Sequence, residues 1–284
     1  MSKAISYSLF GYNKARQINC FDFNSYLRGL MVNIRINRIL YPNWVNVLNI
    51  DSNTLNSPFQ PIFTWLQNKG LLEINLCPND EALCMAMLWR LKPIFFLKDR
   101  TWEYTHVLCR DIDSVATYRE AQAVKQWIDE DKTVHCITDS ISHNIPMMGG
   151  MIGFRPEYFT DRLKVQAWDQ LMRLSENIDY KRKGADQEFL NRYVYPKTFD
   201  SATEHFVLGM KQNIPEGDGR HYSIPDIEIN VDLIYKETNS LAGHIGAAGY
   251  YEPPLVKFLN NIDPYRDEYK EIEKQYSSLF YWRS

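Results

Sequence analysis

The sequence contains few cysteines and no closely spaced pair of them. Its five cysteines are Cys20, Cys77, Cys84, Cys109 and Cys136. No two are spaced as Cys-x-x-Cys, which argues against a zinc site, and the odd number argues against a disulfide framework. Four of the five lie in apolar surroundings, which is typical of reduced thiols in the core of a cytoplasmic protein.

Long apolar runs and a strong net charge are also absent. The longest apolar run covers residues 82–89, far short of the ~20 residues that a membrane span needs, and the N-terminus has no signal-peptide pattern. The 32 Lys and Arg residues nearly balance the 35 Asp and Glu residues, which gives a formal charge of −3. That balance argues against a protein that coats nucleic acid by bulk electrostatics, although it leaves room for a local basic patch.

Strand-like and helix-like patterns alternate through most of the 284 residues. We predict strands over residues 4–10, 44–50, 72–76, 106–109 and 134–138, and helices over residues 26–40, 59–69, 78–90 and 117–128. Thr117 and Glu120 predict a capping box, in which each side chain bonds a free amide of the first helical turn. The alternation is typical of an α/β fold with a mainly parallel sheet and helices on both faces. From about residue 200 the periodicity weakens, so we expect a core over residues 1–200 and a loop-rich extension over residues 201–284, in one compact unit.

Two carboxylates follow the strand expected at residues 106–109. Asp111 and Asp113 stand two residues apart where that strand ends, so both can reach one cation if the backbone bends there. Such hard oxygen ligands suit Mg²⁺ or Mn²⁺, and a cation at this place would neutralise charge on a diphosphate leaving group. The alternative is a pair of solvated acids in a turn.

Three further motifs follow along the chain. Gly149-Gly150 allows a ligand to approach the backbone closely, or it makes a tight turn. Asp186 and Gln187 open a helix after a basic run, either as part of a site or as an ordinary helix start with a favourable acid. The His244-Ile245-Gly246 segment offers a metal or phosphate ligand in a glycine-rich loop, or it is a surface turn.

The order of these motifs resembles that of the metal-dependent GT-A glycosyltransferases, and especially the retaining glycogenin-like group. A more specific similarity, over roughly residues 4–196, is to small glycosyltransferases of bacteria, algal viruses and phages. It is carried by residues 110–114, 119–120, 127, 139, 143 and 146–153. Val115 and the segment Thr138-Asp139-Ser140 depart from that group's pattern beside the expected sugar pocket, which leaves the donor sugar and the role of Asp139 open.

The resemblance implies a single GT-A, Rossmann-like domain and a role for each motif. Mn²⁺ or Mg²⁺ would be held by Asp111, Asp113 and His244. The nucleotide-sugar, expected to be a UDP-sugar, would contact Ser8, Gly11, Arg90, Asp111, Gly149, Gly150 and Gly246. The catalytic set would be Asp186, Gln187 and Asp139, for transfer of a hexosyl or pentosyl group with retention. Arg90 has a second interpretation, as a helix arginine that reaches solvent.

Two acceptors stay open: a carbohydrate, or the hydroxymethyl group of a modified cytosine in phage DNA. The DNA hypothesis needs a basic groove, for which the candidates are Arg28, Arg35, Arg38, Lys181, Arg182 and Lys183. With either acceptor we expect the protein to work in the cytoplasm, that of the host if it is of phage origin. The alternative functions are a non-catalytic nucleotide-sugar-binding protein and a nucleotidyltransferase. The latter usually carries a glycine-rich loop after the first strand, and Gly11 is the single glycine of the segment 11–14.

Overall fold

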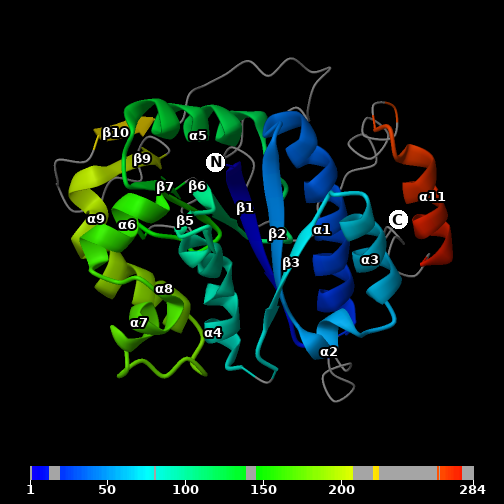
Figure 1. Cartoon of the computed structure of the whole chain (residues 1–284), viewed down its shortest axis with the longest axis horizontal. Coiled ribbons are helices and arrows are strands. Elements are labelled where there is room, and N and C mark those ends of the chain that lie inside the picture. The colour runs from blue at the N-terminus through cyan, green and yellow to red at the C-terminus, as the bar shows by residue number, and fades with distance from the viewer. Residues whose placement is uncertain are drawn as a thin grey trace.

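An eight-stranded sheet runs through the computed structural model (Figure 1). The structure describes residues 2–12, 20–79, 81–138, 145–206, 220–223, 261 and 263–276. The strands of the sheet are β1 (Ser2–Leu9), β2 (Trp44–Asp51), β3 (Glu73–Cys77), β6 (Tyr104–Arg110), β7 (Val134–Thr138), β8 (Met151–Phe154), β9 (Ala202–Phe206) and β10 (Arg220–Ser223). They lie side by side in the order β10-β9-β7-β8-β6-β1-β2-β3. All neighbours are parallel except β8, which runs antiparallel to both β6 and β7, so the prediction of a mainly parallel sheet is confirmed.

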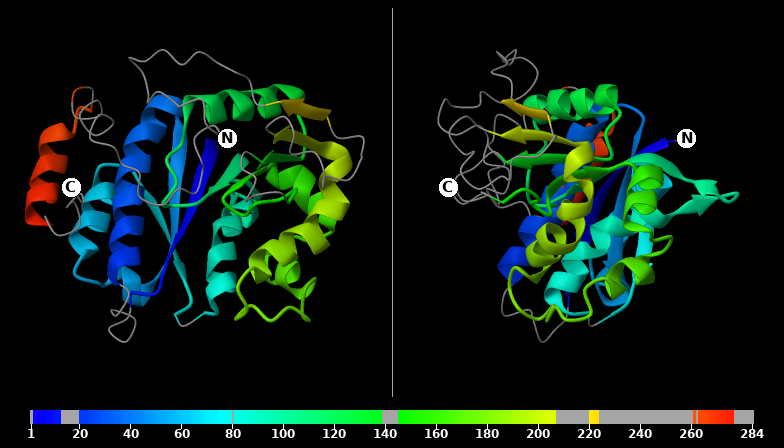
Figure 2. Two further views of the ribbon diagram at one scale, coloured as in Figure 1. Left: turned by 180° about the vertical axis from the view of Figure 1, so that it is seen from behind. Right: turned by 90° about the vertical axis from the view of Figure 1, so that its left-hand side faces the viewer.

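Helices cover both faces of the sheet, as expected (Figure 2). One face carries α1 (Cys20–Leu40), α3 (Gln60–Asn68) and α5 (Tyr118–Glu130), and α11 (Arg266–Gln275) packs beside α1 and α3. The other face carries α4 (Leu83–Leu88), the 3₁₀ segment η2 (Trp89–Phe95), α6 (Pro156–Leu163), α7 (Trp168–Arg173), α8 (Ala185–Phe189), the π-helical segment η3 (Leu190–Val194) and α9 (Tyr195–Thr198). Short elements complete the chain: α2 (Ser52–Leu55), η4 (Phe199–Ser201), and a hairpin of β4 (Leu97–Lys98) and β5 (Thr101–Trp102).

The alternation of side chains along the strands builds two apolar cores. In β1, Ile5 and Tyr7 are buried against α1 and its neighbours, whereas Ala4 belongs to the core on the opposite face. In β6, Leu108 lies in the first core and Val107 in the second. Successive residues of a strand point to opposite faces, so a central strand buried on both sides reads as a continuous apolar run.

The sequence-based expectations omit three strands of the sheet, β8, β9 and β10, and they differ from the structure at the ends of helices. Helix α1 begins at Cys20 rather than at residue 26. The helix expected over residues 78–90 is α4 followed by η2, which contains Pro93, a residue that cannot donate to an α-helical ladder. Four cysteines, Cys77, Cys84, Cys109 and Cys136, are free and buried as expected. Within the described part of the chain, no helix is both long and apolar enough to cross a bilayer.

Candidate active site

The candidate site lies between β1 and β6, where the connections from neighbouring strands lead to opposite sides of the sheet. From β1 the chain passes through α1 to β2 on one side, and from β6 it passes through α5 to β7 on the other side. In open α/β sheets, ligands bind beyond the carboxyl ends of strands at such a switch point. The register pairs Ser6 with Cys109, so Ser8 and Asp111, each two residues further on, come level at that edge.

Asp111 follows the last residue of β6 and is held from two sides. The guanidinium of Arg90, on η2, forms an ion pair with its carboxylate. A Cβ built at Gly150 would collide with the same carboxylate, so the backbone of Gly150 lies directly against it. Arg90 is buried while the Asp111 side chain is 39% exposed. Burial by itself would lower the pKa of Arg90, but the neighbouring Asp111 carboxylate outweighs that effect and the pKa is raised.

Asp113 is half-buried and carries a shifted pKa. Burial first, and then the negative charge of Asp111, raise the pKa of Asp113 to about 6. The carboxyl groups of Asp111 and Asp113 provide hard oxygen donors for a divalent cation. Mg²⁺ is commonly bound by one or two carboxylates together with substrate phosphates and water, so this pair fits such an ion. Among the residues that the structure describes, no group of three or more His, Cys, Asp and Glu side chains could hold a metal by itself.

The glycine pair reaches the same edge because β8 is antiparallel. An antiparallel strand begins where its parallel neighbours end, so Gly149 and Gly150, just before β8, lie beside the end of β6. The Gly149 N–H donates to Oε1 of Gln187 at 3.2 Å. Asn191 of η3 bonds both backbone groups of Met147, at 2.9 and 2.8 Å. The loop before β8 is therefore fastened to α8 and η3 by two side-chain amides.

Asp186, in the first turn of α8, completes the group around Gly149. It is 3% exposed, and Nε2 of Gln187 donates to its Oδ2 at 3.2 Å. A Cβ placed on Gly149 would lie 3.5 Å from Nη2 of Arg90 and 3.6 Å from Oδ2 of Asp186. Arg90, Asp186 and Gln187 thus meet at one backbone position, that of Gly149. Gln187 contacts both Gly149 and Asp186, which indicates a role in holding the site together.

The end of β1 is supported by a residue that sequence reasoning missed. Gly11 has a φ of 82° and donates its N–H to Oδ2 of Asp51 at 3.0 Å. Thr54 accepts from the Tyr12 N–H at 3.0 Å, and Asp51 caps α2 by accepting from the Thr54 N–H at 2.8 Å. Ser8 donates to the backbone oxygen of Met87 at 3.4 Å. An aspartate at a strand end followed by Ser-Asn-Thr is a helix-start signal that would have pointed to Asp51.

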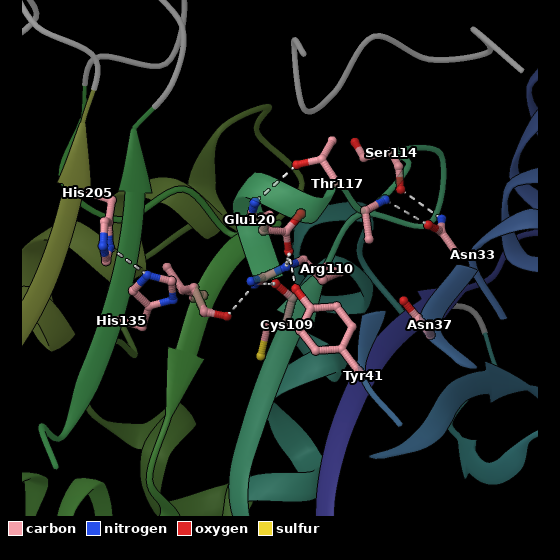
Figure 3. A network of polar contacts seen from close by, with 12 residues as sticks. Asn33, Asn37, Tyr41, Cys109, Arg110, Ser114, Thr117, Glu120, His135 and His205 are labelled. Carbon is pink, nitrogen blue, oxygen red and sulfur yellow. Dashed lines mark hydrogen bonds and ion pairs between the residues drawn. The ribbon is translucent and has the colours of Figure 1, made fainter. Parts of the chain in front are cut away.

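A buried polar network lies beside the segment that joins β6 to α5 (Figure 3). Arg110 forms an ion pair with Glu120 and donates to the backbone oxygens of Cys109 and Ile152 at 2.9 and 2.8 Å. Thr117 caps α5 by accepting from the Glu120 N–H at 3.1 Å. The other half of the expected capping box is wrong, because the Glu120 carboxylate accepts from Arg110 and from the hydroxyl of Tyr41 instead.

The basic groove expected along α1 is also wrong in part. Arg35 is 4% exposed, forms an ion pair with Asp263 at 2.7 Å and stacks on Tyr269. Arg38 forms an ion pair with the same carboxylate at 3.2 Å. Their charges stabilise the attachment of the C-terminal segment, because Asp263 lies just before α11.

The remaining candidates are four basic residues that the structure describes and three residues that it does not. Arg28 is half-buried. Lys181, Arg182 and Lys183 are exposed just before α8, and Arg182 forms an ion pair with Glu188. Asp139, His244 and Gly246 lie outside the described residues.

Comparison with known proteins gives distant similarities in shape. No protein-family model matches the chain, and no curated protein matches its sequence. TarS 1-349 of S. aureus superposes with a TM-score of 0.40 and 13% identity, over 68% of this chain and 55% of that one. The glycosyltransferase GlyE of Streptococcus pneumoniae TIGR4 gives 0.44 and 14%, over 72% and 45%. The mannosyltransferase PcManGT of Pyrobaculum calidifontis, solved with GDP-Man and Mn²⁺, gives 0.41 and 13%, over 80% and 58%. The matches span about half the length of these proteins.

Proposed function

We propose that this chain is a divalent-cation-dependent glycosyltransferase that moves a sugar from a nucleotide-sugar to an acceptor hydroxyl. The observation that carries the proposal is the convergence of Asp111, Arg90, Gly150 and Asp186 at the carboxyl ends of β1 and β6. These groups come from four separate segments of the chain. The carboxylates of Asp111 and Asp113 would suit a divalent cation bound together with a diphosphate, and the Asp186 carboxylate would accept hydrogen bonds from a sugar.

In this proposal Asp111 and Asp113 hold Mg²⁺ or Mn²⁺ on the diphosphate of the donor. When bound, the cation neutralises the charge that develops on the leaving group. Arg90 keeps the Asp111 carboxylate in place through their ion pair. Gly11 and Ser8, at the end of β1, contact the nucleotide. The donor is a UDP-sugar in this proposal, as the resemblance implies.

The reacting sugar is assigned to the neighbourhood of Gly149, Gly150 and Asp186. Gln187 packs against Gly149 and Asp111 packs against Gly150, so the lack of a Cβ at both positions lets these side chains lie close to the backbone. The Asp186 carboxylate accepts hydrogen bonds from hydroxyls on the reacting face of the sugar. Gln187 orients Asp186 and Gly149 through its two hydrogen bonds. Retention of configuration stays a prediction.

A carbohydrate hydroxyl is the acceptor that we favour. Binding of duplex DNA is dominated by contacts of Lys and Arg with phosphates. Arg35 and Arg38 already pair with Asp263, so α1 supplies less of the basic groove than the DNA hypothesis needs. Lys181 and Lys183 remain exposed beside α8 and would carry the contact if DNA were the acceptor.

The test is metal-dependent release of nucleoside diphosphate by the purified protein. A panel of UDP- and GDP-sugars is offered with Mn²⁺, without acceptor, with oligosaccharides, or with DNA containing hydroxymethylcytosine. We expect slow release from one donor, faster release with an oligosaccharide, and loss of release in Asp113→Asn. Asp129→Asn is the matched control, because Asp129 is 60% exposed on α5 and pairs with Lys125. Full activity of Asp113→Asn would overturn the metal site, and acceleration by DNA with a gain in DNA mass would replace the carbohydrate acceptor.

A further inference from the structure

The loop between β6 and α5 has little hydrogen bonding of its own. Residues 111–117 form no helix or strand, yet they include both carboxylates of the proposed metal pair. Within the loop, the Ser114 N–H donates to the backbone oxygen of Asp111 at 3.3 Å. A loop of this kind needs partners from outside to hold its backbone polar groups, because unpaired buried groups are costly.

Asn33 of α1 supplies those partners. Its side-chain NH₂ donates to the backbone oxygen of Ile112 at 3.1 Å and to that of Ser114 at 2.7 Å. Its Oδ1 accepts from the Ala116 N–H at 3.2 Å. All three partners belong to the loop, and Asn33 is fully buried. Figure 3 shows the Asn33 amide turned toward the loop from α1.

The placement of these bonds singles out Asp113. Ile112 and Ser114 are the residues directly before and after it, so the Asn33 amide fixes the backbone on both sides of Asp113. Asp111 is held by other means, through Arg90 and Gly150. Each carboxylate of the pair therefore has its own support from a different element.

We propose that Asn33 is a positioning residue that sets the Asp113 carboxylate for binding of the divalent cation. The inference rests on the proposed function, because it assigns a purpose to a residue that touches neither the cation nor the substrate. Replacing a group that orients a metal ligand without touching the metal commonly lowers the metal affinity about 10- to 100-fold. Asn33 would act in this way through the backbone of the loop.

The same helix offers a matched control. Asn37 lies one helical turn after Asn33, is 2% exposed, and also uses its amide inside the protein. It donates to the hydroxyl of Tyr7 at 2.8 Å and to Oδ1 of Asn46 at 2.7 Å, both outside the loop. Asn33→Ser and Asn37→Ser each remove one buried amide from α1, and the bonds to the loop are lost in Asn33→Ser alone.

The experiment measures Mn²⁺ binding directly, from the electron paramagnetic resonance signal of free Mn²⁺, with and without UDP. We expect the Kd for Mn²⁺ to rise about 10- to 100-fold in Asn33→Ser and to be unchanged in Asn37→Ser, with both variants checked for folding by circular dichroism. In the transfer assay, the apparent KM for Mn²⁺ should rise in Asn33→Ser while kcat at saturating Mn²⁺ is kept. Equal Kd values for wild type and Asn33→Ser would overturn the inference and leave the proposed function standing.

Two further measurements keep the outcome clear. If Asn33→Ser does not fold, Asn33→Thr takes its place, since its side chain fills more of the volume of the amide and still lacks the NH₂ group that bonds the loop. In the wild-type protein, Mn²⁺ should slow hydrogen exchange of the Ala116 amide, and unchanged exchange on saturation with Mn²⁺ would overturn the inference. A wild-type protein that binds no Mn²⁺ with or without UDP would overturn the proposed metal site itself, and the inference with it.

Discussion

Replacing Gly150 by alanine should remove the activity and leave the fold largely intact. A Cβ at this position would overlap the Asp111 carboxylate, so that carboxylate must move. The Asp111 side chain is 39% exposed, which lets it swing toward solvent and keeps the cost of overpacking in the usual range of about 1–3 kcal/mol. At about 2–4 °C per kcal/mol for a protein of this size, the melting temperature should fall by several degrees.

The loss of activity should be far larger than the loss of stability. Moving Asp111 breaks its ion pair with Arg90 and removes one of the two proposed metal ligands. We therefore expect release of nucleoside diphosphate to fall at least as much as when a group that orients a metal ligand is replaced, which costs about 10- to 100-fold. The assays are thermal unfolding by circular dichroism and Mn²⁺-dependent release of UDP.

Gly153→Ala and Gly149→Ala are the matched comparisons. A Cβ at Gly153 would lie 2.9 Å from Leu108 and 2.9 Å from Trp127, both in the core, so this variant should lose about 1–3 kcal/mol of stability but keep its activity per folded molecule. A Cβ at Gly149 would lie 3.2 Å from Nε2 of Gln187. Because this is the end of a side chain that can shift, Gly149→Ala should be less strained than Gly150→Ala. Wild-type activity in Gly150→Ala, or inactive but folded Gly153→Ala, would refute this reasoning.

Three other outcomes are expected. Burial first, and then the positive charges of Arg155 and Lys3, lower the pKa of His106 from 6.5 to about 4. Between these two pH values the unfolded chain binds a proton that the folded chain excludes. The free energy of unfolding should therefore fall by about 3 kcal/mol as the pH drops from 6.5 to 4. His106→Gln should flatten this slope in urea titrations, and an unchanged slope would contradict the assignment. Asp263→Asn leaves the buried Arg35 without its carboxylate and should cost about 3–5 kcal/mol, so an unchanged melting temperature would count against that ion pair. EDTA should abolish release of UDP and Mn²⁺ should restore it, whereas release that persists in EDTA would exclude a required metal.

Much of the sheet was predictable because its strands carry a strong local signal. The strands β1, β2, β3, β6 and β7 are short runs rich in apolar or β-branched residues, and each lies within two residues of the range expected from the sequence. The hairpin of β4 and β5 was not anticipated. Its strands are two residues each and mostly exposed, so no apolar periodicity marks them.

The parts of the site that depend on distant contacts could not be predicted from local patterns. Arg35 looks like one member of a basic strip on an amphipathic helix, yet it is buried because its partner Asp263 lies 228 residues further along the chain. In the sequence, Asn33 is an ordinary polar residue of a helix. Its role depends on the loop that it bonds, which lies about 80 residues further along the chain. The Asp-x-Asp and Gly-Gly segments could be identified as site candidates because each is a short motif of neighbouring residues.

The attachment of the loop before β8 has a mechanical consequence. Asp111 and Asp113 continue from the central strand β6, whereas Gly149, in the loop before β8, is bonded to Gln187 of α8, which also bonds Asp186. The two groups meet at Gly150, which lies against Asp111. A shift of α8 would carry Gly149 with it through Gln187, and because the adjoining Gly150 lies directly against Asp111, the shift would reach the Asp111 carboxylate as well. Packing beneath this single helix can therefore adjust the position of Asp111, while Asp113 keeps its separate support from Asn33.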